Sequence, residues 1–161
     1  MLTPFMKSVT FLGNGGWFWI LCAVVLLAVP KTRKTGYAAA LSLIFGAIVT
    51  NLLLKNIVAR PRPFAEIEAL IPMITKPKDF SFPSGHTAVS FAVTSALYFC
   101  KNKIWIPSAL LSLLIAFSRM YLYVHYPSDI LGGVVLGILV GKLAYDFGIK
   151  LGEKKKGSVA V

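Results

Sequence analysis

Five apolar runs, separated by short polar segments, constrain the fold of this chain more than any other feature of its sequence. They cover residues 16–30, 37–54, 86–100, 104–117 and 130–148. A helix that spans a bilayer needs about 20 mostly apolar residues, and polar residues at its ends can extend a slightly short run. No run alternates apolar and polar residues throughout, which disfavours a barrel. The sequence therefore predicts an all-α integral membrane bundle, one domain over residues 1–161 with five transmembrane helices.

The composition agrees with a chain that lies in lipid. Hydrophobic residues make up 57% of the chain and charged residues only 14%, whereas soluble domains carry about a quarter charged residues. The net charge of +11 comes from basic residues between the apolar runs. These lack the interleaved aromatic residues of a basic recognition face, so no nucleic-acid partner is expected. Cys22 and Cys100 lie inside apolar runs, and their spacing predicts neither a disulfide framework nor a metal site.

The loops between the five runs predict the orientation in a cell membrane. The basic segments KTRK (31–34), KNK (101–103) and EKKK (153–156) fall on one side, and an excess of Lys and Arg marks the cytoplasm. This places the C-terminus in the cytoplasm and the N-terminus outside. The loops 55–85 and 118–129 then face the extracytoplasmic side.

Two glycine-containing segments carry further expectations. Residues 1–12 are too short to cross a membrane and are expected at its interface, before residues 13–16 turn the chain into the bilayer. In the last run, Gly133, Gly137 and Gly141 recur at four-residue spacing, which lets helices approach closely. This spacing allows tight packing within one bundle or a homodimer, and the sequence leaves both open.

Two outward-facing clusters carry candidate ligands for an anion. The segment KNIVARPRP places Lys55 and Arg62 at the outer surface, either as a snorkelling pair or as part of a binding site. In FPSGH, Ser84 is a good N-cap, so a helix is predicted to begin at about Gly85. Its first N–H groups would point outward as a ready anion site, and His86 falls in the first turn.

A third outward-facing cluster, SRMYLYVHYPSD, combines a cation, an imidazole and a carboxylate. Arg119 ends the fourth run, and His125 follows six residues later. Asp129 lies four residues past His125, in the first turn of the last predicted helix. Its carboxylate could complement the helix dipole, or it could hold His125 in one tautomer.

Taken together, the three clusters predict chemistry on a phosphate ester at the membrane surface. Three cations and oriented backbone amides favour an anionic ligand with several oxygens, and arginine suits phosphate in particular. Two histidines favour proton transfer or covalent chemistry at that anion. Neither a Cys/His cluster nor a carboxylate cluster is present in the sequence to form a metal cage, so neither a metal nor a cofactor is expected.

Three motifs occur in order: K-x6-R-P from Lys55, P-S-G-H ending at His86, and S-R-x5-H-x3-D ending at Asp129. Together they resemble the signature motifs of the type 2 phosphatidic acid phosphatase superfamily. That group includes membrane lipid-phosphate phosphatases, bacterial acid phosphatases and vanadium-dependent haloperoxidases. Many membrane members are similar to a six-helix bundle, whereas this chain shows five apolar runs and a short N-terminal segment.

The resemblance implies a role for each candidate residue. His125 would be the nucleophile and would form a phosphohistidine, with Asp129 orienting it. His86 would protonate the leaving oxygen and then activate water. The phosphoryl oxygens would be bound by Lys55, Arg62, Ser84, Gly85 and Arg119.

The expected function is a lipid phosphatase with its active site outside the cytoplasm, and undecaprenyl diphosphate is the preferred substrate. Phosphatidylglycerophosphate and phosphatidic acid are the alternative substrates. A haloperoxidase-type enzyme and a non-catalytic protein that binds lipid headgroups are alternatives of other classes. The loop 65–80, with Glu66, Glu68, Lys76, Lys78 and Asp79, is expected to be solvated, with gating of the headgroup as the other possibility.

Overall fold

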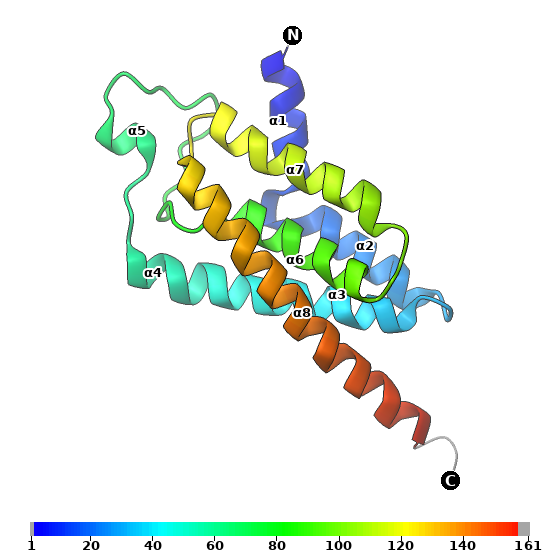
Figure 1. Ribbon diagram of the computed structural model, residues 1–161. Coiled ribbons are helices and arrows are strands. Elements are labelled where there is room, and N and C mark those ends of the chain that lie inside the picture. Colours follow the sequence, from blue (N-terminus) through cyan, green and yellow to red (C-terminus); the bar gives the residue numbers. More distant parts are fainter. Residues whose placement is uncertain (1, 158–161) are drawn as a thin grey trace.

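The computed structural model describes residues 2–157, with side chains described as far as residue 149, and it is helical throughout its regular segments (Figure 1). The elements in chain order are α1 (Leu2–Leu12), η1 (Asn14–Gly16), α2 (Trp17–Ala28), α3 (Arg33–Ala47), η2 (Ile48–Leu54), α4 (Lys55–Val58), α5 (Pro63–Glu66), α6 (Gly85–Phe99), α7 (Trp105–Tyr121) and α8 (Pro127–Gly157). No strand occurs among the described residues. The predicted all-α class is confirmed.

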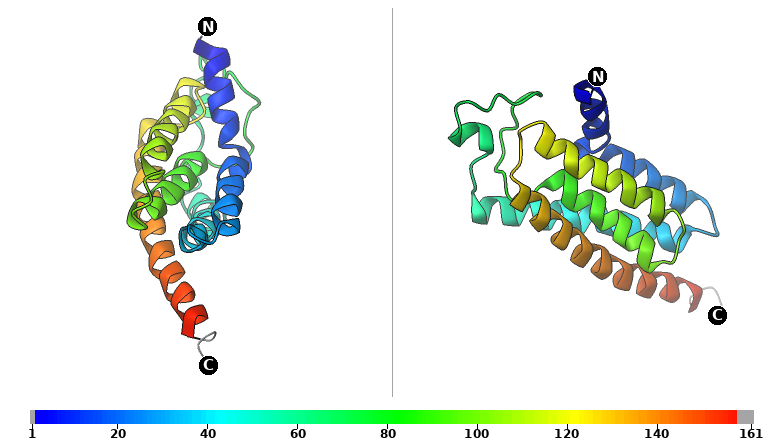
Figure 2. Two further views of the ribbon diagram at one scale, coloured as in Figure 1. Left: turned by 90° about the vertical axis from the view of Figure 1, so that its right-hand side faces the viewer. Right: turned by 45° about the horizontal axis from the view of Figure 1, so that its top comes forward.

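Helix α6 occupies the centre of the bundle. It packs against α3, α7 and α8, while α2 packs along α3. Figure 2 shows these long helices side by side, with α1 standing at a steep angle to them. The buried residues of α6 are mostly small, such as Ala88, Ala92 and Ala96, so neighbouring helices approach it closely. A hydroxyl group of α6 also bonds to α2: the Ser90 Oγ accepts a 2.9 Å hydrogen bond from the indole N–H of Trp19.

The glycine stripe of α8 explains the contact between α6 and α8. A Cβ atom at Gly137 would lie 2.6 Å from the carbonyl oxygen of Ala88, and one at Gly141 would lie 2.5 Å from that of Ala92. Gly133 likewise faces the first turn of α6. Only glycine permits this approach. The stripe therefore packs within the chain, and a homodimer through it stays a prediction.

The N-terminal segment is a helix that bends sharply into the next one. Helices α1 and η1–α2 meet at 45°, and the bend contains Gly15 with φ 58° and Gly16 with φ 70°. These left-handed conformations cost little only for glycine. The prediction that residues 13–16 turn the chain is confirmed.

The outer surface of the bundle is apolar over several helices. Large side chains that are about half exposed or more include Leu21, Val24 and Val25 on α2, Leu110 and Leu113 on α7, and Leu131, Val135 and Leu139 on α8. A monomeric soluble protein rarely exposes an apolar surface this extensive, whereas lipid covers it without cost. The chain is therefore built as a membrane protein.

The structure contains fewer segments that are long and apolar enough to cross a membrane than the five that the sequence predicts. By length and composition, two segments of the described residues could cross a membrane, Arg33–Glu66 and Pro127–Ile149. The bent pair Leu2–Leu12 and Asn14–Ala28 would be a third span if it counts as one. Helix α6 has 15 residues and α7 has 17, which is shorter than the usual span. The exact count of five is not confirmed.

Candidate active site

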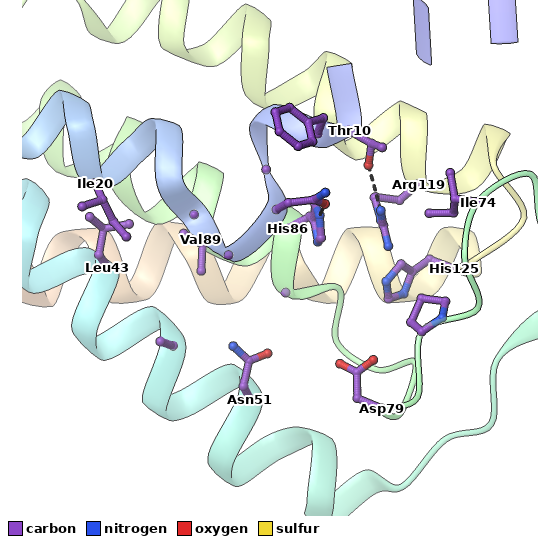
Figure 3. Close-up of a pocket in the computed structure, with 18 of the residues that line it drawn as sticks. Thr10, Ile20, Leu43, Asn51, Ile74, Asp79, His86, Val89, Arg119 and His125 are labelled. Atoms are coloured by element: carbon purple, nitrogen blue, oxygen red, sulfur yellow. Dashed lines mark hydrogen bonds between the residues drawn. The ribbon is translucent and has the colours of Figure 1, made fainter. Parts of the chain in front are cut away.

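One large cavity of about 1310 Å³ lies between the N-terminal bend, the α3–η2–α4 helix, the first turn of α6 and the connection from α7 to α8. Figure 3 shows Asp79, His86, Arg119 and His125 gathered at one end of it, with Ile20, Leu43 and Val89 at the other. Lys55, Arg62 and Gly85 also line this cavity. The structure thus brings the three sequence clusters to one polar end, which continues into an apolar groove.

The first turn of α6 is positioned by its cap. Ser84 is the N-cap, and its Oγ accepts hydrogen bonds from the Thr87 N–H at 3.4 Å and the Thr87 hydroxyl at 3.0 Å. Gly85 begins the helix at the cavity wall, and His86 projects into the cavity from the first turn. Ser84 itself is fully buried. Its hydroxyl therefore builds the helix terminus, and the Gly85 backbone faces the cavity.

His125 lies between a cation and a carboxylate, and this fixes its tautomer. Arg62 Nη1 lies 3.2 Å from His125 Nε2 and can only donate, so Nε2 accepts. On the other side of the ring, His125 Nδ1 donates to Asp129 Oδ2 at 3.3 Å. The lone pair of Nε2 is therefore held on the side of the ring away from Asp129, toward the cations of the cavity.

Burial lowers the pKa of His125 to about 4, and the charges of Arg62 and Arg119 act in the same direction. The hydrogen bond from Asp129 opposes these effects but does not outweigh them. His125 is therefore a neutral imidazole at neutral pH, which is the form required of a nucleophile.

Asp129 is fully buried behind His125 and is held by three further donors. Its Oδ2 accepts from the Ser81 hydroxyl at 2.5 Å and from the Tyr126 N–H at 2.9 Å. Its Oδ1 accepts from Arg60 Nη1 at 2.9 Å, and the Arg60 guanidinium stacks 3.9 Å above the Tyr126 ring. The sequence analysis missed Ser81 and Arg60. Arg60 lies within the K-x6-R-P segment and Ser81 two residues before P-S-G-H, and this position in or near a motif is the only signal that could have found them.

Asp79 is solvated on one side, with its side chain 53% exposed, but it also makes ion pairs that the sequence analysis did not predict. Its carboxylate pairs with Lys55 Nζ, and its second oxygen lies 2.7 Å from Arg62 Nη2. Arg62 also donates to the Asp79 carbonyl at 2.8 Å. Burial raises the pKa of Asp79, but the hydrogen bonds and charges of Lys55 and Arg62 outweigh it and lower the pKa to about 2. Asp79 therefore occupies, as an anion, the two cations predicted to bind phosphate.

Replacing Asp79 with asparagine should strengthen the binding of a phosphate mimic. The carboxylate competes with any oxyanion for Lys55 and Arg62 at every pH above about 2. Because the pair is partly exposed, we expect vanadate to bind about two- to fivefold more tightly to the variant. Vanadate titration of both proteins measures this. Weaker binding would show instead that Asp79 is needed to orient the two cations.

The N-terminal bend closes the opposite wall of the polar end. Arg119, which is 3% exposed, donates from Nη1 to the Thr10 hydroxyl at 2.7 Å, and its buried Nε has no partner among the described residues. Asn14 Oδ1 lies 2.9 Å from His86 Nε2. Thr10 and Asn14 were not predicted as site residues, because nothing in the sequence indicates that an N-terminal segment folds back onto this cavity.

The arrangement can bind a phosphoryl group between cations and present one imidazole lone pair to it. Lys55, Arg62 and Arg119 line the same cavity as both histidines. Within the part of the chain that the structure describes, no group of three or more His, Cys, Asp or Glu residues could hold a metal ion. The absence of a metal requirement stays a prediction.

Comparison with known proteins identifies relatives of this site. The chain is 36% identical over 130 residues to the undecaprenyl-diphosphatase BcrC of Bacillus subtilis, an alignment that covers 80% of this chain and 65% of that protein. It is 33% identical over 127 residues to an undecaprenyl-diphosphatase of Sulfolobus acidocaldarius, which covers 78% and 61%. The chain thus spans less than two thirds of the length of these two curated relatives.

The fold has a solved counterpart. The crystal structure of a transmembrane PAP2-type phosphatidylglycerolphosphate phosphatase from Bacillus subtilis matches with a TM-score of 0.71 at 27% sequence identity, over 92% of this chain and 77% of that one. The family model for the PAP2 superfamily matches residues 35–152, a range that contains all three motifs. The chain therefore belongs to the PAP2 superfamily.

Proposed function

We propose that this protein hydrolyses a lipid phosphate or diphosphate, with undecaprenyl diphosphate as the preferred substrate, through a phosphohistidine on His125. One observation carries the proposal. His125 Nε2 accepts a hydrogen bond from Arg62 while Nδ1 is bonded to Asp129, at the polar end of a cavity that continues into an apolar groove. The names of the two undecaprenyl-diphosphatase relatives support the choice of substrate.

In the first step, Arg62 Nη1 moves from His125 Nε2 to the phosphoryl oxygens, which frees the Nε2 lone pair. This lone pair attacks phosphorus, and the bond from phosphorus to the leaving oxygen breaks. Lys55, Arg62 and Arg119 bind the phosphoryl oxygens with the Gly85 N–H, and Asp79 gives up its two cations to the substrate. His86 gives a proton to the leaving oxygen. Asp129 stabilises the positive charge that develops on His125. Phosphoryl transfer depends mainly on positioning and charge stabilisation, which these groups supply.

In the second step, His86 takes a proton from a water molecule, which attacks the phosphorus of the phosphohistidine. The phosphorus–nitrogen bond breaks, the electron pair returns to His125 Nε2, and inorganic phosphate leaves. His86 then holds the proton that the next cycle needs. In this proposal the chemistry uses side chains alone and no metal ion.

The apolar part of the cavity supports a lipid as the substrate. Ala23, Val24 and Leu27 of α2 face Leu43 and Ile44 of α3 along it. A lipid chain in this groove would replace lipid–lipid contacts by equally apolar protein contacts. The polar headgroup would lie at the cations, at the end where α4, α7 and the loops meet.

The proposal includes the membrane arrangement indicated by the charges. The bundle crosses five times, with the active site on the extracytoplasmic side and the C-terminus in the cytoplasm. The basic loops 31–34 and 101–103 support this orientation. The side chains of the basic tail from residue 150 lie outside those that the structure describes. A homodimer through Gly133, Gly137 and Gly141 is not part of the proposal, because these residues already contact α6.

The plot of kcat/KM against pH should be bell-shaped, and its fall on the acid side should occur at an unusually low pH. The pKa of His125 is lowered to about 4, so its lone pair stays available below the ordinary histidine value of about 6.5 and is lost only near pH 4. On the alkaline side the rate falls as His86 loses its proton. The measurement is kcat/KM against pH, corrected for the ionisation of the substrate. An acid limb at the ordinary histidine value, or a flat profile, would contradict this division of roles.

A panel of lipid phosphates tests the choice of substrate. Purified protein in detergent is given undecaprenyl diphosphate, phosphatidylglycerophosphate and phosphatidate, and released phosphate is measured with and without EDTA. We expect the highest kcat/KM for the isoprenyl diphosphate and no effect of EDTA. A clear preference for phosphatidylglycerophosphate or phosphatidate would contradict the choice of undecaprenyl diphosphate as the preferred substrate. If none of the three lipids releases phosphate, the proposed phosphatase activity is wrong.

A further inference from the structure

We propose that Asn14, in the N-terminal bend, is a positioning residue for His86, so that residues 10–14 complete the active site. The inference rests on the proposed function, in which His86 transfers the proton. It assigns a catalytic purpose to a segment outside the range that the family model matches, which begins at residue 35.

The contact between Asn14 and His86 is the only side-chain hydrogen bond of His86 among the described residues. Asn14 Oδ1 lies 2.9 Å from His86 Nε2. His125, by contrast, is fixed by both Asp129 and Arg62. The orientation of the His86 ring therefore depends on one neutral amide.

The backbone of the bend supports this contact. A Cβ atom at Gly13 would lie 2.6 Å from His86 Cδ2 and 3.2 Å from Ile115 Cγ2. The glycine therefore lets the bend lie directly against the edge of the imidazole. Thr10, one turn earlier, binds Arg119 at 2.7 Å. The same short segment thus contacts the proton donor and one of the phosphate-binding cations.

The chemistry of the amide suits a proton donor in a cationic cavity. The charged and titratable groups that act on His86 are Arg119 of α7, His125, Lys55 of α4 and Arg62, and Lys7 of α1 and Asp79 line the same cavity. Most of them are cations and disfavour a protonated imidazole. The Asn14 oxygen accepts a hydrogen bond from Nε2–H and adds no negative charge that would compete with the phosphate. It therefore orients the ring through Nε2–H and leaves the cations for the substrate.

The test compares two substrates that differ in their need for an acid. Phosphatidate, a lipid phosphate monoester, has a basic alkoxide leaving oxygen that must be protonated, whereas the leaving oxygen of 4-nitrophenyl phosphate needs little help. Undecaprenyl diphosphate is not used in this comparison, because its leaving group is itself a weakly basic phosphate. kcat/KM reports the steps up to phosphoryl transfer to His125. We expect Asn14→Ala to lower kcat/KM for phosphatidate by about tenfold or more, because a general acid contributes about 10²–10⁴-fold. The loss for 4-nitrophenyl phosphate should be less than about threefold, and His86→Ala should show the same pattern more strongly.

A second variant makes the test independent of folding. Asn14→Asp keeps the shape and the acceptor but adds a charge beside the imidazole, which raises the pKa of the ring. The alkaline limb of the pH profile should move up by about one pH unit. Asn56→Ala is the matched control, because Asn56 is exposed outside the cavity and donates to the Leu52 carbonyl. This variant should have the wild-type kcat/KM for both substrates and the wild-type pH profile.

The outcomes separate this inference from the function on which it rests. Asn14 would have only a structural role if Asn14→Ala lowered kcat/KM equally for both substrates and Asn14→Asp did not move the alkaline limb of the pH profile. The proposed role of His86 as the acid would then still stand. An Asn14→Ala variant as active as Asn56→Ala would likewise overturn the inference alone. A wild-type protein that releases no phosphate from any lipid of the panel, or a fully active His86→Ala variant, would overturn both.

Discussion

Replacing His125 with alanine should abolish turnover, with kcat falling by at least about 10³-fold, the scale seen when a catalytic nucleophile is removed. The physical reason is that, in the proposed mechanism, Nε2 of His125 supplies the lone pair that attacks phosphorus. No other imidazole of the cavity has a carboxylate partner among the described residues, so His86 cannot take over the role. Phosphate release from undecaprenyl diphosphate by the purified variant measures the loss.

The binding site itself should survive this replacement. Lys55, Arg62 and Arg119 remain, so a non-hydrolysable phosphonate analogue of the lipid should bind within about threefold of its wild-type affinity, as expected for a residue that acts mainly in the transition state. If the variant lost both binding and turnover, the site would have collapsed. Trapping of the phosphohistidine would then decide whether His125 is the nucleophile. Full turnover by the variant would remove His125 as the nucleophile.

Replacing Asp129 with asparagine should lower kcat by up to about 10⁴-fold, the loss caused by the same replacement in a Ser-His-Asp triad. An amide can present its N–H to His125 Nδ1 and so favour the wrong tautomer, in which the proton sits on Nε2. It also lacks the charge that stabilises the imidazolium formed by attack. Three other donors, from Ser81, Tyr126 and Arg60, lose the same anionic acceptor.

Asp146→Asn is the matched control for this prediction. Asp146 lies on the same helix, has a side chain that is 43% exposed, and pairs with Lys142 at 2.6 Å. Its replacement should leave kcat unchanged. Thermal unfolding of both variants separates a catalytic loss from a loss of stability. An Asp129→Asn variant that unfolds like the wild type and keeps its kcat would show that the pairing with His125 has no catalytic purpose.

The sequence predicted those parts of the fold and the site that depend on local signals. The apolar runs located α2, α3, α6, α7 and α8, and Ser84 marked the start of α6 because an N-cap acts on its own helix. The motif residues were found because each motif is short and contiguous. The structure adds that six of them, Lys55, Arg62, Gly85, His86, Arg119 and His125, line one cavity, while Ser84 and Asp129 are buried outside its lining.

Contacts made by loops and by the N-terminal bend could not be predicted in this way. Asp79 follows two lysines in a polar loop and carries no local mark of its pairing with Lys55 and Arg62. Asn14 reaches His86 across 72 positions of the chain, which only the packing of α1 and α2 determines. The π-helical turn η2, which carries Asn51 to the cavity wall, also left no sequence signal. Such turns are frequent at functional sites.

Trapping of the covalent intermediate tests the central claim most directly. Wild-type protein is mixed with substrate labelled with ³²P at the terminal phosphate, quenched within milliseconds in base, where phosphohistidine survives, and digested for mass spectrometry. The proposed mechanism predicts label on the peptide that contains His125, more label in His86→Ala, and none in His125→Ala. Rapid turnover with label on another residue, or with no labelled protein at any quench time, would contradict it.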